Sequence, residues 1–379
     1  MSAVTTERST GMTPGAAAAP APSAASAVPP VPLEHEDLVL HRGSRSGRYV
    51  IVAIHSTALG PALGGVRLWH YPATIDGIRD ALRLARGMTL KAAAAGLALG
   101  GGKGVICGPD RPPSGRERRD LLLDFGDLVE SLEGRYITAE DVGISPPDVV
   151  TIRERTTHVT GLPPEQGGSG DPSPFTAVGV EAAMRASARA KFGSPDLEGR
   201  RIVIAGAGHV GAKLARRLVE SGARIAISDI DTTKRSLAET LGADWIEPEE
   251  EIVTECDILA PCALGGAIDA ANLPLLRCKV ICGCANNQLD HDGLAVELAE
   301  RGILYAPDFV VNAGGLIHVY REIRGYSEER ARELALGIED NLDRIFEAAA
   351  EESVTPLEAA RALALERLAD ARIERAAVA

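Results

Sequence analysis

The stretch RIVIAGAGHVG, residues 201–211, decides the fold of the C-terminal half of this 379-residue chain. Its apolar beginning is typical of a buried strand, its glycines have the spacing GxGxxG, and a helical pattern follows up to Glu220. Gly206 permits a tight turn, Gly208 lets the backbone approach a pyrophosphate, and Gly211 lets helix and strand pack closely. Because a helix N-terminus offers free N–H groups and partial positive charge, the stretch predicts a dinucleotide-binding turn.

Asp229 supports this interpretation and indicates which dinucleotide binds. It follows the next expected strand, residues 224–228, about 20 residues beyond the glycines, where a carboxylate accepts a hydrogen bond from the ribose 2′-hydroxyl. The same carboxylate repels the 2′-phosphate of NADP, so the predicted cofactor is NAD. The neighbouring Lys234 and Arg235 leave NADP as an alternative, and a glycine-rich turn without any ligand is the structural alternative.

Strands and helices alternate through the region around this motif. Alternation of this kind indicates a parallel sheet with helices on both faces, here a Rossmann-type domain. A hinge rich in Gly and Pro at residues 167–174 precedes this domain, which we place at residues 171–326. Besides 201–205, the expected strands are residues 224–228, 257–260, 279–283 and 303–306.

The preceding region, residues 34–170, is expected to form an α/β domain for substrate binding and oligomerisation. Its expected strands are residues 49–55, 66–70 and 135–138, and its expected helices are residues 74–94 and 116–132. Residues 1–33 are mostly Ala, Pro, Ser and Thr and are expected to be a disordered tail. Residues 327–379 are expected to form two amphipathic helices, separated near Pro356, that return to the first domain.

Composition limits the class of protein. Hydrophobic residues make up 45% and charged residues 25%, and no stretch has the ~20 apolar residues of a membrane helix. The net charge of −13 opposes binding to nucleic acid. The six cysteines lack a repeated spacing, so we expect free thiols, no disulfide framework and no metal site. We therefore expect a cytoplasmic protein with a small-molecule partner and no membrane or nucleic-acid partner.

Two lysines stand out in the first domain. Lys91 lies towards the end of the expected helix, and Lys103 follows three successive glycines in a glycine-rich, apolar segment. A lysine in such an apolar segment is partly desolvated, which disfavours its charged form and lowers its pKa, so that it can act as a base or hold a water. The alternatives are a solvated surface charge or a phosphate-binding turn, although no strand–GxxxxGK[ST]–helix pattern is present.

At this point the sequence resembles the glutamate/leucine/phenylalanine/valine dehydrogenase family, and its leucine and valine members in particular. The resemblance extends from about residue 35 to residue 375, with the motifs in order and on the expected elements. The segments that carry it are residues 60–65, 84–91, 100–103, 134–143, 171–176, 261–266, 285–289, 306–308 and 312–315.

Carried over position by position, the resemblance implies roles on the substrate side. Lys91 binds the substrate carboxylate, Lys103 polarises the developing carbonyl and holds the attacking water, and Asp141 shuttles the amine proton. Asn312 lies on the substrate or nicotinamide side of the cleft. Locally, Asp141 could instead cap the helix that begins near Pro146, and asparagines could simply form turns.

On the cofactor side, the resemblance implies that Thr176 holds the nicotinamide amide and that Asn286 lies at the cofactor ribose region. His209 inside the glycine loop is a departure from many relatives and is expected to alter cofactor affinity. The residues expected to bind NAD are Thr176, Gly206, Gly208, His209, Val210, Gly211, Asp229 and Asn286.

The substrate side chain is expected to be aliphatic. Glutamate-specific relatives carry a lysine at the position that matches Leu63, and an apolar residue there leaves a substrate carboxylate buried and unpaired. Gly64 and Ala139 are expected to line the same pocket, with Ile338 and Leu342 on the far wall. Valine and leucine rank first, followed by isoleucine. Phenylalanine or another aromatic amino acid is the alternative, because one methylene is worth only ~1–3 kcal/mol.

The resemblance thus implies a homo-oligomeric enzyme that oxidatively deaminates a branched-chain L-amino acid with NAD, reversibly, to the 2-oxo acid, ammonia and NADH. An alternative of a different class is a catalytically silent NAD-binding sensor. A sensor has no need of Lys91, Lys103 and Asp141 together, which favours the enzyme.

Overall fold

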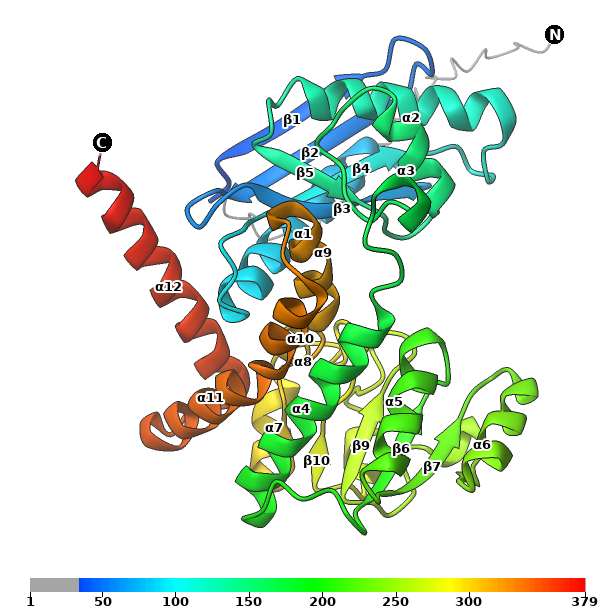
Figure 1. The fold of residues 1–379 in the computed structure, drawn as a ribbon, viewed down its shortest axis with the longest axis vertical. Helices are drawn as coiled ribbons and strands as arrows, with labels where there is room; N and C mark the ends of the chain where they lie inside the picture. The colour runs from blue at the N-terminus through cyan, green and yellow to red at the C-terminus, as the bar shows by residue number, and fades with distance from the viewer. Residues whose placement is uncertain (1–33, 379) are drawn as a thin grey trace, which may run out of the picture. The chain divides into compact units, whose positions relative to one another are not determined.

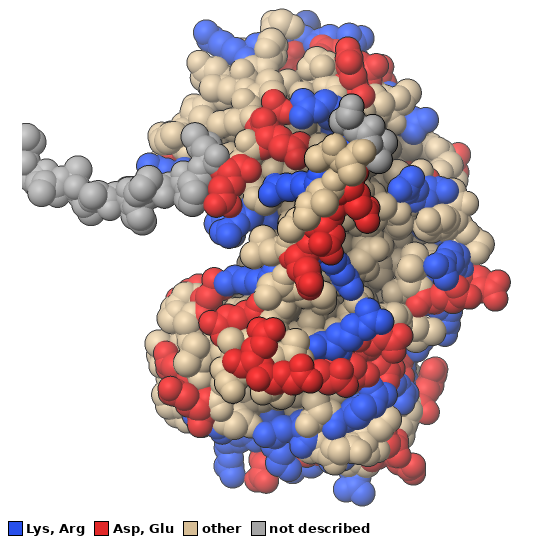
Figure 2. Space-filling model, turned by 90° about the vertical axis from the view of Figure 1, so that its left-hand side faces the viewer, with Lys and Arg blue, Asp and Glu red and all other residues tan. Residues whose placement is uncertain are grey.

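The computed structural model describes residues 34–378, which contain two β-sheets (Figure 1). The expected tail, residues 1–33, lies outside the described residues. Within residues 34–378 no helix is long and apolar enough to cross a membrane, and no three His, Cys, Asp or Glu side chains are grouped to hold a metal ion. All six cysteines lie in this range and are free thiols. On the face drawn in Figure 2, basic side chains are interspersed with acidic ones.

The first domain is built on a mixed five-stranded sheet with the order β1-β2-β4-β3-β5. β2 pairs antiparallel with both β1 and β4, whereas β3 lies parallel to both β4 and β5. The strands are β1 (Asp37–Arg42), β2 (Tyr49–Ser56), β3 (Ala62–Trp69), β4 (Gly100–Cys107) and β5 (Tyr136–Ala139).

Helices cover both faces of this sheet, which is why β2 reads as a continuous apolar run (Figure 1). Ile51 and Ala53 pack against α1, whereas Val50, Val52 and Ile54 lie in a cluster with side chains of α2 and α3. The covering helices are α1 (Thr74–Ala94), α2 (Gly115–Glu130) and α3 (Pro146–Arg153).

Two strands of the first sheet depart from the sequence expectation. Residues 100–104 were assigned to no expected strand, but they begin the central strand β4. Their glycines allow close approach of neighbouring elements: a Cβ at Gly100 would lie 2.0 Å from Ser56 O, and one at Gly101 would lie 2.1 Å from Thr89 N. β1 is a half-exposed edge strand whose mixture of polar and apolar residues gave no strand signal.

The second domain contains a six-stranded, fully parallel sheet with the order β11-β10-β9-β6-β7-β8. The chain moves outward from β6 in one direction and returns through β9 in the other, so the strand order reverses between these two strands. Crevices at such switch points hold ligands in open α/β sheets. The strands are β6 (Arg201–Ala205), β7 (Arg224–Ser228), β8 (Asp244–Trp245), β9 (Ile258–Pro261), β10 (Val280–Ile281) and β11 (Leu304–Tyr305).

Helix α4 connects the two domains and is buried along most of its length. It packs against α5 and α9 and against two helices of the C-terminal segment. The helices of the second domain are α4 (Ser173–Phe192), α5 (His209–Glu220), α6 (Arg235–Leu241), α7 (Leu294–Glu300), α8 (Asp308–Val311) and α9 (Gly314–Arg324).

The C-terminal segment contains three helices where two were expected: α10 (Glu328–Leu336), α11 (Ile338–Glu352) and α12 (Pro356–Val378). α10 and α11 pack on α4, whereas α12 packs on α1, where Arg367 donates to Ala93 O at 2.7 Å and Ala94 O at 2.8 Å. Ile338, expected on the far wall of the substrate pocket, is a buried residue whose Cδ1 faces Gly179 of α4. Leu342 is likewise fully buried in the core.

Candidate active site

Lys103 is a buried cation in the middle of β4. Its side chain is 6% exposed, and its Nζ lies 2.9 Å from Oδ2 of Asp141. Burial lowers the pKa of Lys103, although the ion pair with Asp141 opposes this shift. Lys103 therefore reaches its neutral form at a lower pH than an ordinary lysine.

Asp141 follows β5 and is held by two cations. Its Oδ2 accepts from Nε of Arg67 at 3.0 Å and lies against Lys103. Burial alone raises the pKa of Asp141, but Lys103 and Arg67 more than offset it and hold the pKa below its ordinary value. Asp141 does not cap α3, since Ser145 and Asp148 form that cap. Its carboxylate is thus ionised and aimed at Lys103.

Strand register places the predicted pocket residues on one face of the first sheet. Leu63 pairs with Gly101, and Gly65 pairs with Ala139, so Leu63, Lys103 and Ala139 share a face by the alternation of strand residues. α1 covers this face, since Gly101 lies against Thr89. Gly64 has the opposite orientation, and its carbonyl accepts from the Tyr136 hydroxyl at 2.5 Å.

Lys91 lies on α1, near Lys103. Its Nζ donates to Oδ1 of Asn286 at 3.2 Å, which links the first domain to the loop after β10. Burial lowers the pKa of Lys91 to about 8, Asp308 opposes this shift, and Lys103 adds to it. Lys91 therefore remains a cation at neutral pH and can hold a small anion.

Asn286 and Asn312 lie together beside Lys91. Nδ2 of Asn312 donates to Oδ1 of Asn286 at 2.8 Å and to Cys284 O at 3.2 Å. Oδ1 of Asn312 is buried and has no hydrogen-bond partner among the described residues. This orphaned acceptor suits an N–H or N–H₃⁺ donor of a bound molecule, because a buried polar atom without a partner is costly.

The glycine loop has the conformation that its sequence predicts. Gly206 has a φ of +111°, and a Cβ at Gly211 would lie 2.0 Å from Gly206 O, so both positions need glycine for local geometry. A Cβ at Gly208 would meet no atom within 4 Å, which leaves space in front of the loop. His209 is exposed at the first position of α5, and Val210 follows it.

The surroundings of this loop fit NAD. Asp229 Oδ2 accepts from Ala207 N at 2.7 Å, which fixes its carboxylate beside the loop. Arg235, one basis of the NADP alternative, is paired with Glu247 and lies over the ring of Trp245. The open space at Gly208 and the helix N-terminus supply the cradle that a pyrophosphate requires.

Thr176 lies on α4, where its hydroxyl donates to Pro172 O at 3.1 Å. A Cβ at Gly315 of α9 would come within 3.1 Å of the same hydroxyl oxygen. Thr176 is therefore held at the start of α4, beside α9.

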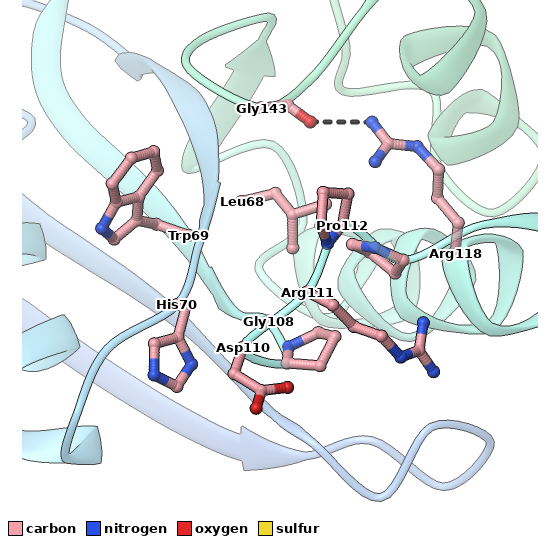
Figure 3. Close-up of a pocket in the computed structure, with 11 residues that line it drawn as sticks. Leu68, Trp69, His70, Gly108, Asp110, Arg111, Pro112, Arg118 and Gly143 are labelled. Carbon is pink, nitrogen blue, oxygen red and sulfur yellow. Dashed lines mark hydrogen bonds between the residues drawn. The ribbon is translucent and has the colours of Figure 1, made fainter.

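A separate pocket lies in the first domain and contains none of the expected site residues (Figure 3). Leu68, Trp69 and prolines of the β4–α2 loop line it, and Arg118 closes one side by donating to Gly143 O at 2.7 Å. The pocket thus adjoins the segment that follows Asp141.

Three residues of the site were not predicted from the sequence. Arg67 and Asp80 form an ion pair at 2.9 Å and connect to Asp141. Gly65 lets the chain after β5 come close, since a Cβ there would lie 2.9 Å from Cβ of Asp141. The available signal was the strand alternation of Leu63, Gly65 and Arg67, which places all three on the face of Lys103.

Comparison with known proteins identifies the family. The model of the Glu/Leu/Phe/Val dehydrogenase dimerisation domain matches residues 39–158, and the Glutamate/Leucine/Phenylalanine/Valine dehydrogenase model matches residues 227–376. A model of the D-isomer specific 2-hydroxyacid dehydrogenase NAD binding domain matches residues 177–265. The chain belongs to the glutamate/leucine/phenylalanine/valine dehydrogenase family.

Individual relatives are similar to this chain over nearly its whole length. The chain is 46% identical to the leucine dehydrogenase of Bacillus subtilis over 343 residues, 90% of this chain and 92% of the relative. It is 46% identical to the valine dehydrogenase of Streptomyces virginiae over 342 residues, 89% of this chain and 95% of the relative. The crystal structure of L-tryptophan dehydrogenase from Nostoc punctiforme superposes with a TM-score of 0.80 and 40% identity, covering 89% of this chain and 97% of that one.

These comparisons confirm the predicted family, the α/β fold with a Rossmann-type domain, the NAD cofactor, and the class of enzyme, an NAD-dependent amino-acid dehydrogenase.

Proposed function

We propose that the chain catalyses the reversible oxidative deamination of a branched-chain L-amino acid with NAD, and that Lys91, Lys103 and Asp141 carry the reaction. The observation on which this proposal depends is the buried ion pair of Lys103 and Asp141, 2.9 Å apart and near the cation of Lys91. The sensor alternative offers no reason to keep these three desolvated charges together.

Lys91 and its neighbours bind and orient the amino acid. Its ammonium group holds the substrate carboxylate, and Asn286, 3.2 Å away, limits where that carboxylate can lie. The unpartnered Oδ1 of Asn312 accepts from the nicotinamide amide or the substrate amine. Binding at these points fixes the substrate Cα for transfer.

Asp141 and Lys103 move the protons. Asp141, ionised at neutral pH, accepts a proton from the substrate ammonium group, which prepares Cα for oxidation. Bound NAD supplies the hydride acceptor. Lys103 then polarises the carbon of the substrate imine and holds the water that adds to it, and Asp141 returns its proton to the departing ammonia. Substrate, NAD and water thereby yield the 2-oxo acid, an ammonium ion, NADH and one proton.

The preferred side chain is aliphatic, with valine and leucine first. Leu63 is 2% exposed and shares its sheet face with Ala139, so a charged substrate side chain would be left without a partner. The relatives named leucine and valine dehydrogenase support this choice. An aromatic substrate is the second candidate, because L-tryptophan dehydrogenase has the same fold at 40% identity.

The chain acts as a homo-oligomer that assembles through its first domain. Support comes from the family model for residues 39–158, which is described as a dimerisation domain.

Replacement of the lysines tests these roles. Lys103→Ala should lower kcat by about 10³-fold or more, because it removes the group that holds the water, while the Kd of NAD stays unchanged. Lys91→Ala should mainly raise the KM of the amino acid. Activity would be followed as NADH formation, and NAD binding by calorimetry. Normal turnover in Lys103→Ala, or an unchanged KM in Lys91→Ala, would contradict the assigned role.

A further inference from the structure

Arg67 is the second cation on Asp141, and it is held in a network that the reaction as described does not use. Its Nε donates to Oδ2 of Asp141 at 3.0 Å, the same oxygen that faces Lys103. Its NH1 donates to Oδ2 of Asp80 at 2.9 Å. One guanidinium group therefore bridges a carboxylate of the candidate active site and a carboxylate of α1.

Asp80 is itself fixed in place. The Tyr71 hydroxyl donates to its Oδ2 at 2.7 Å, and Arg83 donates to its Oδ1 at 2.8 Å. Its side chain is 15% exposed, whereas that of Arg83 is 61% exposed. Asp80 is thus held in place by Tyr71 and Arg83, and its bond to NH1 fixes the direction in which the Arg67 guanidinium group points.

The backbone beside Arg67 is shaped for this contact. A Cβ at Gly65 would lie 2.3 Å from Glu140 O and 2.9 Å from Cβ of Asp141, so only glycine lets the segment after β5 pack this close to β3. Arg67 lies two residues further along the same face of β3. There it contacts the carboxylate of Asp141, which the close packing at Gly65 brings near β3.

We propose that Arg67 is a positioning residue for the reaction: anchored by Asp80, it holds Asp141 ionised and aimed at Lys103. The inference rests on the proposed function, because it assigns Arg67 a task only if Asp141 transfers protons. Lysine does not replace arginine here, because a single ammonium group lacks the planar fork that binds two carboxylates in fixed directions.

The pKa of Asp141 depends on the charged and titratable groups around it. They are Lys103 from β4, Arg67 from β3, Lys91 from α1 and the Tyr136 hydroxyl from β5. Arg67 lowers the pKa of Asp141 and also that of Lys103. Removal of the guanidinium group therefore raises both pKa values, and each change moves the onset of oxidative deamination to higher pH.

The test is the pH profile of kcat for leucine oxidation by Arg67→Met in the full chain. We expect kcat to fall about 10–100-fold and the acid limb to move to higher pH, with little change in the Kd of NAD. The kcat and the acid limb of Arg67→Lys should lie between those of the wild type and those of Arg67→Met. Arg83→Met is the matched control, because Arg83 contacts the same Asp80 but not Asp141, and its profile should equal that of the wild type.

Asp80→Asn provides a second, smaller perturbation that keeps the guanidinium group, and it should move the acid limb in the same direction. An acid limb that stays in place in both variants, even with a lower kcat and Tm, would reduce Arg67 to a structural residue and overturn the proposal. Asp141→Asn distinguishes a failure of the role of Arg67 from a failure of the proposed function. If it is inactive while Arg67→Met is normal, only the role of Arg67 fails; if it is fully active, the proposed function fails with it.

Discussion

Residues 100–104 and residues 206–211 are both rich in glycine, but glycine serves different purposes in them. In the first segment it permits packing: Gly100 and Gly101 lie against backbone atoms of β2, α1 and the turn before β3, and Lys103 is buried by that packing. In the second segment Gly206 and Gly211 shape a turn, whereas Gly208 faces open space. The packed segment buries a charge of the protein, and the open segment leaves room for the charge of a ligand.

The largest effect is expected from Gly101→Ala, which would add a Cβ 2.1 Å from Thr89 N. The backbone of α1 must then move, so we expect a loss of about 1–3 kcal/mol in the free energy of unfolding, with kcat reduced because α1 carries Lys91. Thermal and urea unfolding would measure the loss. Wild-type stability would show that this strand tolerates side chains and would remove the basis of the comparison.

Gly208→Ala is the counterpart in the open segment. Its backbone has a φ of −68°, which alanine adopts without strain, and the new methyl group meets no protein atom within 4 Å. We expect unchanged stability but a Kd of NAD raised about tenfold, equivalent to ~1.4 kcal/mol, because the methyl group occupies the approach of the pyrophosphate. Calorimetric titration with NAD measures this Kd. An unaltered Kd would place the pyrophosphate elsewhere.

Lys91→Arg tests how burial in the first domain changes the pKa of a lysine, and its expected effect on activity is smaller. The pKa of Lys91 is lowered to about 8, so the carboxylate-binding cation is present below this pH and is lost as the pH rises through it. The alkaline limb of kcat/KM should therefore move to higher pH when arginine, which does not titrate in this range, takes its place. A limb that stays near the wild-type position would assign it to another group.

The sequence predicted the Rossmann-type domain well because its signals are local. The strand, the glycines and the helix of residues 201–220 follow one another directly, and residues 201–205 and 224–228 form strands with the expected bounds. Asp229 also lies beside the glycine loop, although its hydrogen bond to Ala207 N was not foreseen.

The first domain was harder to predict because its signals depend on tertiary packing. GGGKG gave no strand signal, because its strand depends on close packing against Ser56, Thr89 and Tyr136 of neighbouring elements. The roles of Lys91, Lys103 and Asp141 came from family resemblance, and Arg67 was missed because its partners lie 13 and 74 residues away along the chain. The break between α10 and α11 at Gly337 was also missed.

The measurement that tests the account most directly is the rate of NADH formation by the purified chain with NAD and a panel of L-amino acids at alkaline pH. We predict that leucine or valine is oxidised fastest and glutamate very slowly. Fastest oxidation of phenylalanine or tryptophan would keep the mechanism and contradict the aliphatic pocket at Leu63 and Ala139. Binding of NAD without oxidation of any amino acid would contradict the proposed function and favour an NAD sensor.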